Sequence, residues 1–183
     1  MELRKEEALV IVLSGKARSG KDTSLEILKR KYEQIGKKVI SLYYASYIKE
    51  YAKKISSWDG SDENKPRTLL QVLGTDIIRN TIDKNFFINR IIEDIKVYSK
   101  FFDVIIIGDA RFPEEIDYIK NEFKNVISVH INRKDMNLLT EEEKKHVTET
   151  ALDSYKGYDY EINNDGSIEE LEEKLSIILK DND

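Results

Sequence analysis

The chain of 183 residues contains no cysteine, only two prolines and a single tryptophan. Without cysteine it can form no disulfide, no thiolate nucleophile and no zinc–thiolate site. It also lacks a long apolar run, because the first hydrophobic stretch, residues 8–13, is far too short to span a bilayer and leads into a glycine loop. No targeting signal is visible. We therefore expect a cytoplasmic protein with no membrane partner.

The chain has no excess of positive charge. Its formal net charge is −5 and its acidic and basic residues are interspersed, so nothing indicates a nucleic-acid-binding surface. Apolar residues make up 40 % of the chain, which is enough for a core and excludes global disorder. The length suits one α/β domain over residues 1–183.

Short apolar segments alternate with amphipathic ones. Strands are predicted at residues 8–14, 39–44, 104–107, 126–131 and 158–162. Helices are predicted over residues 23–35, 46–55, 66–78 and 87–102, from Pro113, and from Ser167, which has capping-box spacing with Glu170. Thr140 and Glu143 share that spacing and predict one more short helix. This alternation implies a parallel sheet with helices on both faces, which binds ligands beyond the carboxyl ends of its strands.

A phosphate-binding loop is predicted between the first strand and the first helix. The segment Gly15, Lys16, Ala17, Arg18, Ser19, Gly20, Lys21, Asp22 and Thr23 has the G-x-x-x-x-G-K spacing. Its glycines let backbone N–H groups converge on a phosphate, and the following helix adds its positive end. Lys21 would reach the β- and γ-phosphates of a nucleotide, and Arg18 would face the nucleotide.

The loop departs from the strict motif at one position. Asp22 follows the lysine, where the motif has serine or threonine as a magnesium ligand, and Thr23 comes one residue later. A carboxylate is a good hard-oxygen ligand, so Asp22 is a candidate to bind Mg²⁺. A second candidate, Asp109, ends the apolar strand Val104–Ile107 after Gly108. In P-loop folds such an acid holds magnesium directly or through water.

Arginine is scarce beside lysine, with eight arginines among thirty basic residues. Because arginine is the better bidentate phosphate ligand, each mid-chain arginine is a candidate to bind the acceptor. For Arg79 and Arg111 we favour acceptor binding over the alternative that the side chain lies on a solvated helix face. For Arg67 the two interpretations are equally supported, and for Arg90 the solvated face is favoured. Arg133, after the fourth strand, could offset charge on the transferring phosphoryl group.

Other polar and aromatic residues carry weaker signals. His146 and Glu149 lie three residues apart in a polar stretch, which favours a substrate-binding or capping role over a metal site. Ser46, Tyr47 and Trp58 could line a base pocket, although tyrosine and tryptophan are as often packing residues.

Several segments together resemble the deoxynucleoside monophosphate kinases of large phages, a branch of the P-loop kinases. The matching segments are residues 13–23 including Asp22, Leu70–Thr75 with Gln71 and Arg79, Asp109–Glu115, His146–Glu149 and residues 158–167. The resemblance covers nearly the whole chain.

The resemblance implies a three-layer α/β/α fold with a five-stranded parallel sheet and a helical lid and acceptor region. It implies ATP with Mg²⁺ as the donor and a deoxynucleoside 5′-monophosphate as the acceptor. An acceptor-binding insert is expected at about residues 45–102 and a moving lid at about 133–150. The acceptor site would include Arg67, Gln71, Arg79 and Arg111. A homodimer is also compatible with it.

Three functions stay open on the residues alone. The first is phosphoryl transfer to a nucleotide phosphate, which needs no general base because the acceptor oxygen is already ionised; Lys21, Asp109 and Arg133 would then be the catalytic residues. The second is a related kinase with a hydroxyl acceptor, such as hydroxymethyluracil in DNA or phosphomevalonate, for which Asp109 would be the base. The third is a nucleotide-dependent switch, which would leave the acceptor-side arginines unexplained.

Overall fold

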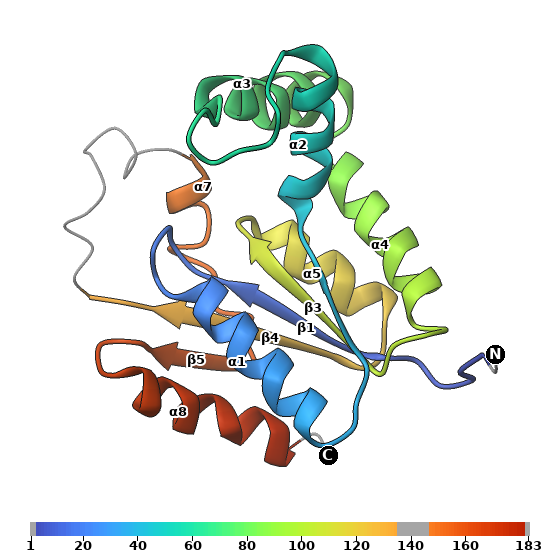
Figure 1. Ribbon diagram of the computed structural model, residues 1–183, viewed down its shortest axis with the longest axis vertical. Helices are drawn as coiled ribbons and strands as arrows, with labels where there is room; N and C mark the ends of the chain where they lie inside the picture. The colour runs from blue at the N-terminus through green and yellow to red at the C-terminus, as the bar shows by residue number, and fades with distance from the viewer. Residues whose placement is uncertain (1–2, 135–146, 182–183) are drawn as a thin grey trace.

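The computed structural model describes residues 3–134 and 147–181. Its centre is a five-stranded sheet in the order β2-β3-β1-β4-β5, in which all neighbouring strands run parallel (Figure 1). The strands are β1 (Leu9–Ser14), β2 (Val39–Leu42), β3 (Val104–Ala110), β4 (Val126–Asn132) and β5 (Tyr160–Asn163). The predicted parallel α/β sheet is confirmed.

Two layers of helices enclose the sheet. On one face lie α1 (Lys21–Gln34) and α8 (Ile168–Asp181), and on the other lie α4 (Phe86–Tyr98) and α5 (Pro113–Glu122) (Figure 1). Side chains alternate along β1: Ile11 and Leu13 pack with the first pair of helices, whereas Val10 and Val12 pack with the second. Two cores therefore hold β1 rigidly, and the loop that follows β1 starts from a fixed point.

A helical region extends beyond the carboxyl ends of the strands. It contains α2 (Tyr44–Ile55), α3 (Arg67–Gln71) and η1 (Val72–Ile82), with a small core of its own formed by Ala52, Trp58 and Leu73 (Figure 1). These elements fall within the expected acceptor insert at residues 45–102. Trp58 is buried in this core, and its Nε1 donates to Ser61 O at 2.8 Å, so it is a packing residue.

The structure differs from the predicted elements at two informative places. The second half of the predicted helix over residues 66–78 is the π-helix η1, which extends to Ile82. Strand β3 continues through Gly108 to Ala110, so Asp109 lies inside a strand rather than after one. The helix expected at Thr140 lies outside the described residues, as do His146 and most of the expected lid; a short helix, α7 (Val147–Thr150), follows. Within residues 3–134 and 147–181, no helix combines the length and apolarity needed to cross a membrane.

Candidate active site

The predicted phosphate loop joins β1 to α1 at the carboxyl edge of the sheet. Gly15 has a φ of 144° and Gly20 a φ of 98°, values that side chains rarely permit. A Cβ atom on Gly15 would lie 2.4 Å from Ile131 O, and one on Gly20 would lie 2.2 Å from Asn164 Nδ2. Both glycines are therefore required by the backbone conformation and by close neighbours, as expected for a loop that turns tightly around an anion.

Lys21 is buried at the start of α1 and bends back over the loop. Its Nζ donates to Gly15 O at 2.9 Å and to Lys16 O at 2.8 Å. Burial, followed by the nearby charge of Arg111, lowers the pKa of Lys21 to about 8. The lysine is thus held inside the loop, where the negative charge of a bound phosphate would raise its pKa again.

A residue that the sequence did not single out fixes the far end of the loop. Asn164, at the end of β5, is buried, and its Nδ2 donates to Ser19 O at 2.9 Å. Its own backbone N–H donates to Asn132 O at 2.7 Å, which ties this side chain to β4. The loop conformation therefore depends on the two strands at one side of the sheet. Asn164 lies in the segment of residues 158–167 that resembles the phage kinases, but its contact with the loop was not visible in the sequence.

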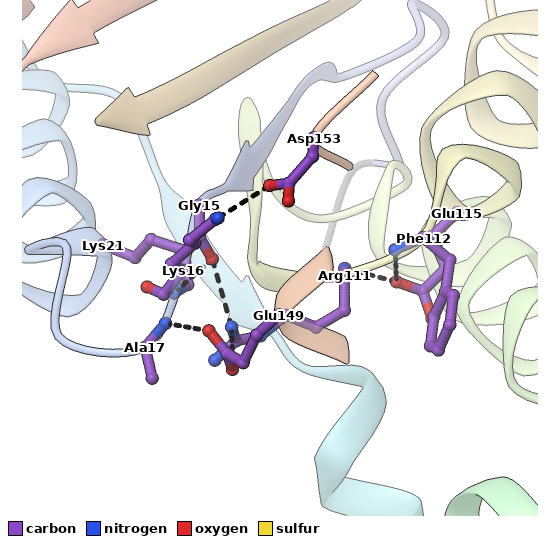
Figure 2. A network of polar contacts seen from close by, with 9 residues as sticks. All are labelled: Gly15, Lys16, Ala17, Lys21, Arg111, Phe112, Glu115, Glu149 and Asp153. Carbon is purple, nitrogen blue, oxygen red and sulfur yellow. Dashed lines mark hydrogen bonds and ion pairs between the residues drawn. The ribbon is translucent and has the colours of Figure 1, made fainter. Parts of the chain in front are cut away.

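Glu149, in α7, contacts the phosphate loop directly (Figure 2). Its Oε2 accepts the backbone N–H of Ala17 at 2.7 Å, and its Oε1 accepts Arg111 Nη1 at 2.8 Å. Arg111 Nη1 also donates to Gly15 O at 3.2 Å. These four residues form a network that joins the loop, the end of β3 and α7.

A cavity of about 450 Å³ opens between the phosphate loop and the helical region. Its walls combine aromatic and aliphatic side chains with a few cations and carboxylates, the composition of a small-molecule site. Three of the four predicted acceptor-binding residues, Gln71, Arg79 and Arg111, line this cavity together. The other lining residues that bear on its chemistry are Asp22, Tyr43, Lys65, Thr75, Phe87, Asp109, Phe112, Glu115 and Thr148.

Arg79 is held in place at the cavity wall. Its guanidinium carbon lies 3.7 Å from the centre of the Phe112 ring, and its Nη2 lies 3.2 Å from Glu114 Oε2. Stacking on an aromatic ring and pairing with a carboxylate together restrict an arginine to one direction. The π-helix places Arg79 on the cavity side of η1, where the ring of Phe112 meets it.

Asp109 lines the cavity and also joins β3 to the start of α2 by hydrogen bonds. Its two carboxylate oxygens accept the backbone N–H groups of Tyr44 at 2.8 Å and Ala45 at 2.9 Å, at the start of α2. Burial raises the pKa of Asp109, while these two hydrogen bonds and the charge of Arg111 oppose that rise. Asp109 therefore serves as the N-terminal cap of α2 from another element.

The two predicted magnesium ligands share the cavity wall. Asp22 is exposed at the start of α1, and both Asp22 and Asp109 line the cavity. Within the described ranges, no cluster of three or more histidine, cysteine, aspartate or glutamate side chains has the geometry of a metal site. Magnesium commonly uses one or two carboxylates together with substrate phosphates and water, so this donor set fits Mg²⁺ that arrives with a nucleotide.

Glu115 is a buried carboxyl group at the edge of the cavity. Its Oε2 accepts the backbone N–H groups of both Arg111, at 2.6 Å, and Phe112, at 3.1 Å. Burial is the largest effect on this group and raises its pKa to about 8. Through its contact with the backbone of Arg111, Glu115 fixes the point from which that side chain starts.

Two predicted residues lie elsewhere. Arg67 is exposed at the start of α3, and Arg133 is exposed just after β4; neither lines the cavity. The sequence predicts Arg133 at the site because it follows a strand of the sheet, but its side chain is exposed and is not among those that line the cavity. Of the residues considered for a base pocket, Ser46 lines the cavity, whereas Tyr47 donates its hydroxyl to Asp94 instead.

Several solved structures with this fold are named as small-molecule kinases. The APS kinase CysC of Mycobacterium tuberculosis matches with a TM-score of 0.60 at 12 % identity, covering 95 % of this chain and 98 % of that one. Shikimate kinase from Aquifex aeolicus matches with a TM-score of 0.52 at 18 % identity, with coverage of 95 % and 98 %. Together with the glycine loop and its lysine, these matches show that the chain has the fold of the P-loop kinases.

Sequence comparison identifies the family to which the chain belongs. The family of deoxynucleotide monophosphate kinases matches residues 42–175, so the chain belongs to that family. The enzyme of that name from Escherichia phage RB69 is 34 % identical over 115 residues, which cover 62 % of this chain and 44 % of the relative. The one from Enterobacteria phage T4 is 32 % identical over 120 residues, covering 65 % and 47 %. The match thus spans less than half the length of either phage enzyme.

Proposed function

We propose that the protein transfers the terminal phosphoryl group of ATP to a deoxynucleoside 5′-monophosphate. The observation that carries this proposal is the cavity beside the phosphate loop, with Arg79 and Arg111 on its wall. A nucleotide switch has no need of an acceptor cavity with two restrained arginines beside its phosphate loop. A kinase with an anionic acceptor needs such a cavity to bind the acceptor. The names of the phage relatives supply the class of acceptor.

The donor side of the proposal rests on the loop. Its glycines and Lys21 have the arrangement that binds nucleotide phosphates, and one structure of the CysC kinase contains AMPPNP and APS. We propose ATP with Mg²⁺ as the donor, with Asp22 as the more accessible magnesium ligand and Asp109 acting from the cavity wall.

The acceptor side follows from charge. A monophosphate carries an ionised oxygen that can attack without a base, so the site must position it and offset its charge. Arg79 and Arg111 are suited to hold that phosphate, and the apolar rings of Tyr43 and Phe87 are suited to the base or sugar. Arg67 and Arg133 take part in this proposal only if ligands bring them inwards.

A hydroxyl acceptor is the competing function. It would require a base in the cavity, and Asp109 is the carboxylate that the sequence offered for this role. Both oxygens of Asp109 already accept N–H bonds from α2, which hold the carboxylate at the start of that helix and away from the position that a general base beside an acceptor hydroxyl would need. This arrangement favours the phosphate acceptor.

The deciding experiment measures ADP and nucleoside diphosphate formed from Mg²⁺-ATP with each deoxynucleoside and ribonucleoside monophosphate. At least one deoxynucleoside monophosphate should stimulate ADP formation. The amount of ADP formed should then equal the amount of the corresponding deoxynucleoside diphosphate. The Lys21→Ala variant should lose about 100- to 1,000-fold in turnover, because it removes a charge aimed at the transferred group. Stimulation by DNA containing hydroxymethyluracil, and by no monophosphate, would contradict the proposal.

A further inference from the structure

Glu149 joins the donor and acceptor sides of the candidate active site. One of its carboxylate oxygens accepts the N–H of Ala17 in the phosphate loop, and the other accepts Nη1 of Arg111 (Figure 2). The Glu149 side chain is only 10 % exposed, so both bonds are largely shielded from water. Shielded bonds to a charged group are stronger and more directional than those of surface ion pairs.

The contact restrains Arg111 at one end of its guanidinium. Nη1 donates to Glu149 Oε1 at 2.8 Å and to Gly15 O at 3.2 Å, which places this nitrogen against the loop. A guanidinium carries five N–H donors in a rigid planar fork, so fixing one nitrogen sets the direction of the others. Because Arg111 lines the cavity, donors remain for an acceptor phosphate bound there.

Charge gives a second reason for the contact. Arg111 and Lys21 are close enough that the arginine lowers the pKa of the lysine, after burial, while Glu149 acts in the opposite direction. Without the carboxylate, two cations would repel each other across the loop, and Arg111 would be displaced from Gly15. Glu149 therefore offsets a repulsion as well as providing an acceptor.

We propose that Glu149 is a positioning residue that holds Arg111 at the wall shared by the phosphate loop and the acceptor cavity. In this role it acts through Arg111, which presents the acceptor phosphate to the donor. The inference rests on the proposed function and goes further, because it assigns the alignment of the two substrates to a residue in α7. Such alignment affects the rate strongly, since a displacement of about 1 Å can cost about 100-fold.

A double-mutant cycle tests this assignment. Glu149→Ala, Arg111→Ala and the double variant are compared in kcat/KM for the monophosphate, with KM for ATP measured alongside. Each single variant should lose about 10- to 100-fold in kcat/KM for the acceptor. In the Arg111→Ala background, Glu149→Ala should cost no more than about twofold, because the residue through which it acts is gone.

Two further variants make the cycle specific. Glu149→Gln has a single carbonyl oxygen and can replace only one of the two acceptors, so its loss should be intermediate. Asp153→Asn removes the same charge from a nearby position: Asp153 pairs with loop residue Lys16 at 2.7 Å, with both side chains exposed. Such exposed pairs contribute little, so this variant should keep wild-type constants within about twofold.

Three outcomes would overturn the inference. Losses that multiply in the double variant would show that Glu149 acts independently of Arg111. Tighter ATP binding in Glu149→Ala, with acceptor kinetics unchanged, would show instead that the carboxylate competes with nucleotide phosphates. Wild-type constants in both Glu149 variants would leave the contact without a role in the reaction. If the wild-type protein phosphorylates no monophosphate at all, the proposed function fails first, and this inference with it.

Discussion

Glu115 is a buried acid that accepts two backbone N–H groups at the same oxygen, Oε2. Its folded-state pKa of about 8 lies above the ordinary value of 4.5, because burial penalises the charged form. Between these two pH values the folded protein holds a proton on Glu115 that the unfolded chain releases. Stability contributed by this proton is present below pH 4.5 and is lost as the pH rises to about 8.

The variant Glu115→Gln tests this at the scale of one residue. Its amide oxygen can accept both N–H groups that Oε2 accepts, but it cannot ionise. Between pH 5 and 8, the unfolding free energy of the wild-type protein should fall relative to the variant by at most about 1.4 kcal/mol per pH unit, and the difference should level off above pH 8. Urea denaturation across this range measures it. Parallel curves for the two proteins would contradict the raised pKa.

At the scale of elements, the start of α2 depends on β3. No side chain within α2 caps its first turn, and Asp109 supplies both acceptors for the N–H groups of Tyr44 and Ala45. The same aspartate lines the cavity with Asp22. One carboxylate therefore sets where the helical region begins and also lines the cavity.

The matched variants Asp109→Asn and Asp22→Asn separate these roles. Asparagine at 109 offers one oxygen where two are needed, so a buried N–H loses its acceptor and stability should fall by about 1–3 kcal/mol. Asparagine at the exposed position 22 should leave stability unchanged but raise the Mg²⁺ concentration needed for turnover. Denaturation curves and magnesium titrations measure both effects. Equal stability of the two variants would show that the α2 contact contributes nothing.

Much of this arrangement could be predicted at the level of elements. Short apolar runs such as Val104–Ile107, which is rich in β-branched residues and followed by glycine, favour a buried strand. The glycine loop between β1 and α1 is contiguous in the sequence, so its spacing alone predicts it. The resemblance to the phage kinases assigned Gln71, Arg79 and Arg111 to one acceptor site, and the structure brings these three residues together in one cavity.

The contacts that join distant segments could not be predicted in the same way. Glu149 lies 132 positions from Ala17, and Asn164 lies 145 positions from Ser19, so no spacing rule connects them. The cap that Asp109 provides for α2 crosses 65 positions. The π-helix was missed because residues 72–82 have the same apolar spacing as an α-helix, and tertiary packing decides between the two.

At the scale of the whole molecule, two binding regions share one edge of the sheet but use different elements. The phosphate loop is fixed by β1, β4 and β5 through Gly15 and Asn164. The cavity wall that carries Arg79 belongs to η1 and α5. Arg111 and Glu149 lie between the phosphate loop and the cavity. We therefore expect that the nucleotide donor and the acceptor can each bind alone, and that each contacts this pair of residues.

Thermal unfolding with each ligand alone tests this organisation. A ligand at 100 times its Kd stabilises the folded state by about 2.7 kcal/mol, which for a chain of this size raises Tm by roughly 5–10 °C. In Lys21→Ala, the shift caused by Mg²⁺-ATP should disappear while the shift caused by the deoxynucleoside monophosphate remains. Arg79→Ala should show the reverse, because its partners Phe112 and Glu114 belong to the cavity wall and not to the loop. If either variant loses both shifts, the two ligands bind one region, and the division of the site into donor and acceptor halves is wrong.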